Sequence, residues 1–172
     1  TDISQMQSWN RYPTYETYTA MMQNFAFQYP SLCSVDTIGM SVNGRLLLCL
    51  RLTDNSYNEN QKPKFFYSSS IHGDELTGMI MLLRLADSLL SSYQSDETIR
   101  DLLSSLELYI CPLANPDGAY AGGNASISSA TRYNANHIDL NRNFPDPVMG
   151  SHYDGEQYQT ETMAFMNYAR VR

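Results

Sequence analysis

The chain has 172 residues, of which 42% are hydrophobic and 17% charged, a composition typical of one globular domain with a sizeable core. A net charge of −7, with only 11 Lys and Arg residues and no basic run, argues against nucleic acid or an anionic membrane as the main partner. No apolar stretch approaches the roughly 18 residues that span a bilayer, so no membrane span is predicted. Three cysteines without C-x-x-C spacing argue against a disulfide framework or a structural zinc cluster.

The N-terminal third predicts one helix followed by a strand hairpin. From Thr14 or Tyr15 to Gln28, apolar residues recur at helical spacing, and Pro30 ends the pattern. Segments 34–42 and 45–53 flank Asn43-Gly44, a strong hairpin signal, and therefore predict two antiparallel strands. The helix residues expected to face the core are Tyr15, Tyr18, Met22, Phe25 and Ala26.

A strand and a longer helix are predicted next. Residues 54–63 are polar and turn-rich, which indicates an exposed loop leading into a strand over 64–71. Residues 76–90 repeat apolar side chains every three to four positions and predict a buried helix. Cys49 and Cys111 stand in strand-like apolar runs, so we expect them to be buried as small hydrophobic groups.

A short helix over 96–104, capped by Asp96 or the serine before it, is followed by a strand over 106–111. The alternation of strands and helices predicts an α/β fold with a mixed, mostly parallel twisted sheet and helices on both faces. Such sheets place their sites at the carboxyl ends of strands. His72 and Asn115 both fall just beyond such ends.

The last third contains a long irregular segment and a final helix. Residues 114–158 are rich in Gly, Asn, Asp, Ser and Pro and show little periodicity. An irregular stretch of this length is usually functional. Residues 160–172 predict a helix. The residues expected on its buried side are Met163, Ala164, Phe165 and Tyr168.

His72 and Glu75 stand three residues apart at the predicted strand-to-helix turn. An imidazole nitrogen and a carboxylate oxygen at this spacing can converge on one cation, and both are suitable zinc ligands. Alone, H-x-x-E is a weak signal, because a capping Glu beside an exposed His gives the same pattern. For Asp74, between the two, a buried hydrogen-bonding role is favoured over that of a base.

Two later motifs add to this pair. Residues 115–118 read Asn-Pro-Asp-Gly, which by itself predicts a structural turn. Residues 131–146 combine two arginines with several amide side chains in a loop. This composition suits the binding of a carboxylate and of a polarised carbonyl.

In this order, the motifs resemble those of the metallocarboxypeptidases of the carboxypeptidase A/B superfamily, the M14 peptidases. The resemblance covers essentially the whole chain and is greater to the regulatory and bacterial branches than to the digestive enzymes. It implies the zinc carboxypeptidase fold, with residues 1–172 as the N-terminal portion of a single catalytic domain. Further matching positions are Trp9, Tyr12 to Tyr15, Ile38-Gly39, Gly44-Arg45, Asp139 to Asp146 and Glu161-Thr162.

The resemblance implies a zinc-dependent exopeptidase that hydrolyses the C-terminal peptide bond of peptides or proteins. His72 and Glu75 then match two of three ligands of one Zn²⁺, as in the His₂Glu site of carboxypeptidase A. Arg132 matches the arginine that stabilises the oxyanion developing at the scissile carbonyl. Asn141 and Arg142 match the pair that binds the free C-terminal carboxylate.

By the same resemblance, the third ligand and the catalytic Glu lie beyond residue 172. Neither His137 nor His152 stands at the third-ligand position. We therefore expect the 172-residue chain to be inactive alone and to need a C-terminal half or a second chain. A secreted, periplasmic or extracellular location is also implied, although this numbering includes no signal peptide.

Two other functions remain open at this stage. One is a zinc amidase or deacylase that acts on a cell-wall peptide or an N-acyl substrate. The other is a non-catalytic homologue that serves as a binding module. The Asn141-Arg142 pair favours a carboxylate-terminated substrate and hence the exopeptidase.

Overall fold

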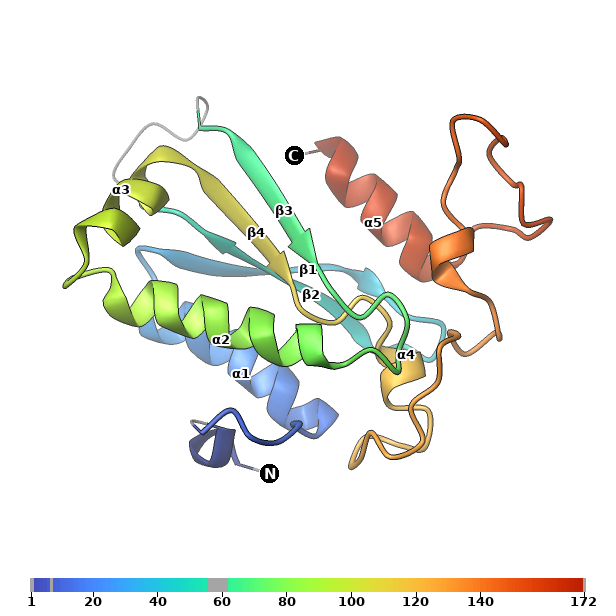
Figure 1. Ribbon diagram of the computed structural model, residues 1–172, viewed down its shortest axis with the longest axis horizontal. Helices are drawn as coiled ribbons and strands as arrows, with labels where there is room; N and C mark the ends of the chain where they lie inside the picture. Colours follow the sequence, from blue (N-terminus) through green and yellow to red (C-terminus); the bar gives the residue numbers. More distant parts are fainter. Residues whose placement is uncertain (1, 7, 56–61, 172) are drawn as a thin grey trace.

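The computed structural model describes residues 2–6, 8–55 and 62–171, and within them the strands form one sheet in the order β1-β2-β4-β3 (Figure 1). Most of the expected loop at 54–63 lies outside the described residues. In chain order the elements are η1 (Ile3–Met6), α1 (Tyr15–Gln28), β1 (Cys33–Met40), β2 (Leu46–Leu52), β3 (Lys64–Ser68), α2 (Thr77–Ser92), α3 (Glu97–Ser105), β4 (Glu107–Cys111), α4 (Pro116–Ala119), η3 (Leu140–Arg142) and α5 (Thr160–Val171).

The elements predicted from the sequence are present, with ends shifted by a few residues. Helix α1 begins after Thr14, whose hydroxyl accepts a hydrogen bond from the Thr17 N–H, as expected of an N-cap. Asp96 caps α3 in the same way. The Asn43-Gly44 hairpin is confirmed, because β1 and β2 pair antiparallel and Gly44 has a φ of +79°, a conformation that suits glycine.

The sheet is mixed, which confirms the α/β class, but the expectation of mostly parallel pairing is wrong for the described strands. The pairs β1/β2 and β2/β4 are antiparallel, and only β3/β4 is parallel. The physical reason lies in the connections: α2 and α3 cross from β3 to β4, as a parallel pair requires, whereas β1 and β2 form a hairpin.

Helices cover both faces of the sheet, as predicted. Alternate strand residues point to opposite faces: Leu50 belongs to the large apolar cluster beneath α1 and α2, whereas Cys49 belongs to a small cluster beneath α5. Cys33, Cys49 and Cys111 are all buried free thiols, which confirms the prediction that Cys49 and Cys111 are small hydrophobic groups.

Within α5, Ala164 and Tyr168 are buried as predicted, but Met163 is 41% exposed, so that part of the prediction is wrong. Glu161 and Thr162 are buried instead, because their side chains bond polar groups of neighbouring loops. Glu161 accepts the Val42 N–H, and the Thr162 hydroxyl donates to Asn143 Oδ1. Apolar periodicity alone does not reveal such polar anchors.

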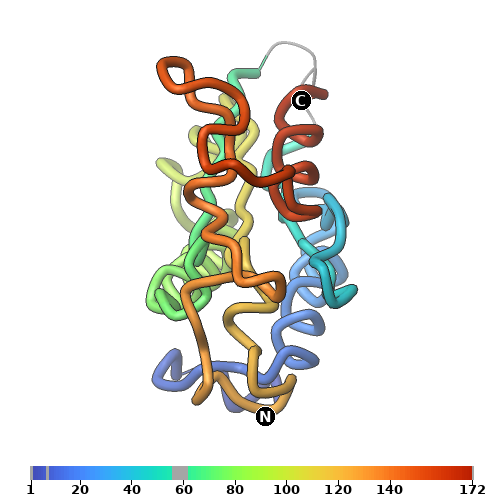
Figure 2. Tube along the Cα trace, turned by 90° about the vertical axis from the view of Figure 1, so that its right-hand side faces the viewer, coloured from blue at the N-terminus to red at the C-terminus, as the bar shows by residue number. Residues whose placement is uncertain are grey.

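Two further features of the fold bear on the site. Strand β3 lies at one edge of the sheet and exposes three aromatic side chains, Phe65, Phe66 and Tyr67. The segment between α4 and α5 runs along one side of the molecule (Figure 2).

Within the described residues, no helix has both the length and the hydropathy needed to cross a membrane.

Candidate active site

The site is built where the parallel strands β3 and β4 end side by side. Ser68 is paired with Cys111 at these ends, and His72 and Asn115 each follow four residues later. The two segments that follow these strands stay in contact, because the Asn115 N–H donates to Ser70 O at 3.0 Å. The predicted position of His72 and Asn115 at the carboxyl ends is thus confirmed.

A tight turn then presents His72 and Glu75. Ser70 has a φ of +56°, unusual for a residue other than glycine, and its hydroxyl donates to Glu75 O at 2.9 Å, which closes the turn. Gly73 packs directly against α4: a Cβ on Gly73 would lie 2.3 Å from Gly118 C. Only glycine therefore fits next to His72 at this position.

The two predicted metal ligands face each other. His72 Nδ1 lies 3.1 Å from Glu75 Oε1, close to the roughly 3.3 Å expected between two ligand atoms of a tetrahedral zinc with bonds of about 2 Å. The His72 side chain is buried, and Glu75 is 64% exposed. The pair therefore fits two positions of a zinc site.

Both ring nitrogens of His72 have polar neighbours. Nε2 lies 3.2 Å from Asp139 Oδ1, and Nδ1 lies 3.3 Å from Arg132 Nη1. The Asp139 carboxylate can accept from Nε2–H, and the Arg132 guanidinium, which only donates, favours a lone pair on Nδ1; the Glu75 carboxylate, 3.1 Å from Nδ1, would accept from the other tautomer. The tautomer with the proton on Nε2 is the one that allows Nδ1 to bind a metal while Nε2 is held by a carboxylate.

Asp139 connects the parts of the site, although the sequence reasoning gave it no role. One carboxylate oxygen accepts from Arg132 Nε at 2.9 Å and from Nη2 at 2.8 Å. The other accepts the Asn141 N–H at 2.9 Å and thereby caps η3. Burial disfavours the charged form of Asp139, but these hydrogen bonds outweigh it and lower the pKa of the carboxyl.

The predicted carboxylate-binding pair lies beside this group. Asn141 and Arg142 are exposed residues of η3, and the Arg142 N–H donates to Asp139 O at 2.9 Å. The structure thus brings His72, Glu75 and Arg132 into direct contact and attaches Asn141 and Arg142 through Asp139.

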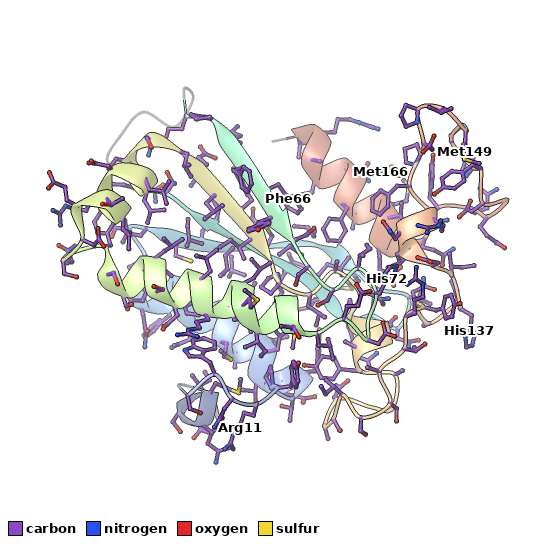
Figure 3. All side chains as sticks on the ribbon, in the orientation of Figure 1. Arg11, Phe66, His72, His137, Met149 and Met166 are labelled. Carbon is purple, nitrogen blue, oxygen red and sulfur yellow. The ribbon has the colours of Figure 1, made fainter. Side chains whose placement is uncertain are left out.

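Three other candidates stand apart. His137 is exposed on the outer side of the long segment, away from His72 (Figure 3), and the exposed His152 has Nδ1 2.9 Å from Glu156 O. Asp74 is exposed, so the expected buried role is wrong. Among residues 2–6, 8–55 and 62–171, no group of three or more His, Cys, Asp or Glu side chains is arranged to hold a metal.

A sequence signal for Asp139 did exist. An Asp two residues before the Asn141 amide that it caps is a typical N-cap pattern. Its contact with His72, 67 residues away, had no counterpart in the local sequence.

Comparison with known proteins shows which family the chain resembles. The sequence profile of the zinc carboxypeptidases (peptidase family M14) matches residues 18–169. Mouse carboxypeptidase M is 37% identical over 164 residues, which are 94% of this chain and 36% of that protein. Mouse carboxypeptidase D is 34% identical over 152 residues, which are 87% of this chain and 11% of that protein.

The fold is also similar to that of a solved structure. The crystal structure of thrombin activatable fibrinolysis inhibitor superposes with a TM-score of 0.84 and 19% identity, covering 99% of this chain and 47% of that chain. The chain therefore spans less than half the length of each of these three proteins.

Proposed function

Because the chain belongs to the zinc carboxypeptidase family, we propose that it carries part of the active site of a zinc-dependent exopeptidase that removes C-terminal residues from peptides or proteins. One observation carries this proposal. His72, Glu75, Arg132 and Asp139 form a single group, joined by contacts of 2.8 to 3.3 Å.

His72 Nδ1 and Glu75 Oε1 are the proposed zinc ligands. When bound, zinc polarises a carbonyl and makes a water nucleophilic near neutral pH. The protein's part is orientation: Asp139 holds the His72 ring with Nδ1 turned toward Glu75. Removing such an outer carboxylate typically weakens metal affinity 10- to 100-fold.

Arg132 is proposed to stabilise the negative charge that develops on the scissile carbonyl oxygen. Its Nε and Nη2 are fixed on Asp139, which sets the plane of the guanidinium, and Nη1 lies on the His72 side. A donor held in advance in this way needs little reorganisation during the reaction.

Asn141 and Arg142 are proposed to bind the free carboxylate of the substrate. Both are exposed, and an arginine fork matches a carboxylate with two parallel hydrogen bonds. Because Asp139 accepts the Asn141 N–H, the carboxylate-binding pair is held at a constant distance from Arg132. This arrangement favours the bond next to a free C-terminus.

Further polypeptide is proposed to complete the site. The described residues bring only two candidate ligands together, and two ligands bind zinc much more weakly than three. We propose that the third ligand and the proton acceptor come from residues beyond 172 or from a second chain. The outer edge of β3, with its exposed aromatic residues, suits such an addition.

We also propose a secreted, periplasmic or extracellular location, by resemblance alone.

The test uses the full-length parent protein, with zinc content and hydrolysis of a blocked dipeptide as readouts. We expect His72→Ala to lose both. We expect Arg142→Met to keep zinc and to lower kcat/KM about 100-fold, which corresponds to roughly 3 kcal/mol. The matched control His137→Ala, an exposed histidine outside the group, should change neither readout.

Substrate chemistry separates the alternatives. An exopeptidase of this kind should hydrolyse the dipeptide with a free carboxylate and leave its C-terminal amide intact. Equal hydrolysis of both would support an amidase and contradict the carboxylate-binding role of Arg142. A parent protein that binds no zinc and hydrolyses neither substrate would support a non-catalytic binding module.

A further inference from the structure

A buried carboxamide joins the two segments that carry His72 and Arg132. Asn115 is 0% exposed. Its Nδ2 donates to Ile71 O at 3.3 Å and to Arg132 O at 3.2 Å, and its Oδ1 accepts the Gly118 N–H at 2.9 Å. Main-chain carbonyls only accept and the Gly118 N–H only donates, so this orientation of the amide is fixed by its partners.

Main-chain packing brings the same three segments close together. The Gly73 N–H donates to Arg132 O at 3.3 Å, and the Thr131 N–H donates to Gly118 O at 2.9 Å. A Cβ on Gly118 would lie 2.6 Å from Tyr133 O. Because the backbones touch, a change in the hydrogen bonds between them shifts the segments themselves.

Helix capping does not account for this residue. Helix α4 has four residues, and its cap requires only an oxygen, which Asp or Ser also supplies. Both Nδ2 protons of Asn115 instead point to carbonyls outside α4, one adjacent to His72 and one in Arg132 itself. This second task requires an amide.

From this geometry we propose that Asn115 is a positioning residue that fixes Arg132 relative to His72. It contacts neither substrate nor metal and acts through the main chain of the two residues. The inference rests on the proposed function, since it assigns to Asn115 the alignment of the carbonyl-stabilising arginine with the metal-binding histidine.

The informative variant is Asn115→Asp. It keeps the shape and the oxygen that caps α4 but faces Ile71 O and Arg132 O with an acceptor. The matched control is Thr53→Val. Thr53 is also buried, and its hydroxyl lies 3.2 Å from Leu103 O and 2.9 Å from Leu106 O, both in another part of the fold. Each variant thus removes a buried side-chain donor group that faces two carbonyls, and Thr53→Val also removes the hydroxyl that accepts from Lys62 Nζ at 2.9 Å.

Three readouts are measured for both variants after circular dichroism shows them to be folded. We expect Asn115→Asp to weaken Zn²⁺ binding by the full-length parent protein about 10-fold or more and Thr53→Val to change it less than about twofold. Amide exchange at Gly73, which needs no metal, should be about 10-fold faster only in Asn115→Asp. In the full-length parent protein, kcat should fall about 10-fold with KM unchanged.

Unchanged exchange at Gly73 in folded Asn115→Asp would overturn the proposal. Equal effects of both variants would overturn it too, because they would indicate a general loss of stability. If Asn115→Asp does not fold, Asn115→Ser, which keeps a capping oxygen, is expected to show the same exchange effect. If the wild-type parent binds no zinc, the proposed function fails, whereas exchange at Gly73 still decides whether Asn115 positions the two segments.

Discussion

The two faces of the sheet are held in different ways. The face beneath α1 and α2 is one continuous apolar cluster, with Leu50, Leu83 and Met22 fully buried in it. Among the described residues, the face beneath α5 has an apolar cluster of four buried side chains and is joined by polar pairs. The apolar face therefore supplies most of the burial energy, which is proportional to area, and the α5 face depends on directional bonds.

The polar pairs of the α5 face are well defined. Arg51 binds the Glu107 carboxylate with two nitrogens, each at 3.1 Å, and the Tyr109 hydroxyl donates to the same carboxylate. Burial and this carboxylate raise the pKa of Tyr109 to about 12, so the phenol stays a donor near neutral pH. On α5, the Tyr168 hydroxyl donates to Asp36 at 2.6 Å. Such bonds set positions while adding modest net stability.

The largest effect is expected on the apolar face. Leu83→Ala should lower the free energy of unfolding by about 3 kcal/mol, because it removes a fully buried side chain and leaves a cavity. Urea denaturation measures the change. The control Met81→Ala lies on the same helix but is 65% exposed, so about 0.5 kcal/mol or less is expected. Similar losses in both variants would contradict the proposed dominance of this face.

A smaller, pH-dependent effect is expected for Arg51→Met. Burial disfavours the charged Glu107, but Arg51 and Tyr109 outweigh it and lower the pKa of this carboxyl below its ordinary 4.5. The pair therefore stabilises the fold above pH 4.5, and this contribution is lost as the pH falls through the lowered pKa. We expect a loss of about 2 kcal/mol at pH 7.

Urea denaturation of wild type and Arg51→Met between pH 3 and pH 7 gives the measurement. The difference between the two proteins should shrink as the pH falls below 4.5. A difference that is constant over this range would show that Arg51 acts by packing and not through the charge of Glu107. Arg100→Met serves as a pH-independent control, because within the described residues the guanidinium of Arg100 donates to main-chain carbonyls and not to a carboxylate.

The smallest effect is expected for Tyr168→Phe. The change removes one hydrogen bond to Asp36 and keeps the ring, so the free energy of unfolding should fall by about 1 kcal/mol. Tyr12→Phe, at an exposed tyrosine, should cost less. If Tyr168→Phe equalled the loss from Leu83→Ala, the apolar face would not be the dominant one.

The candidate site shows the same division between local and distant information. The turn with His72 and Glu75 was predictable, because both residues belong to one short motif between a strand and a helix. Arg132, Asn141 and Arg142 were predicted by resemblance, and their roles stay predictions. Local sequence gave no sign that these segments meet at Asp139, because the contact with His72 joins residues 67 positions apart.

The sheet shows where reasoning from the sequence failed. The strand, helix, helix, strand order predicts a parallel pair, and β3 and β4 form one. It does not predict that β2 would pair antiparallel with β4, because that pairing depends on how the ends of the hairpin meet a distant strand. The burial of Glu161 in place of Met163 on α5 was missed for the same reason, because it depends on contacts with segments distant in the sequence.

The sequence by itself determined the helices, the strands, the hairpin turn and the candidate ligand pair, because periodicity, capping and turn chemistry act over a few residues. Only the tertiary structure decided the order of the strands and the hydrogen-bond partners of Asp139 and Asn115. Both side chains form hydrogen bonds with residues from separate segments. The direction and length of such a bond are set only after those segments have packed together. The turn with His72 and Glu75 is thus a local feature, whereas its alignment with Arg132 is a property of the whole fold.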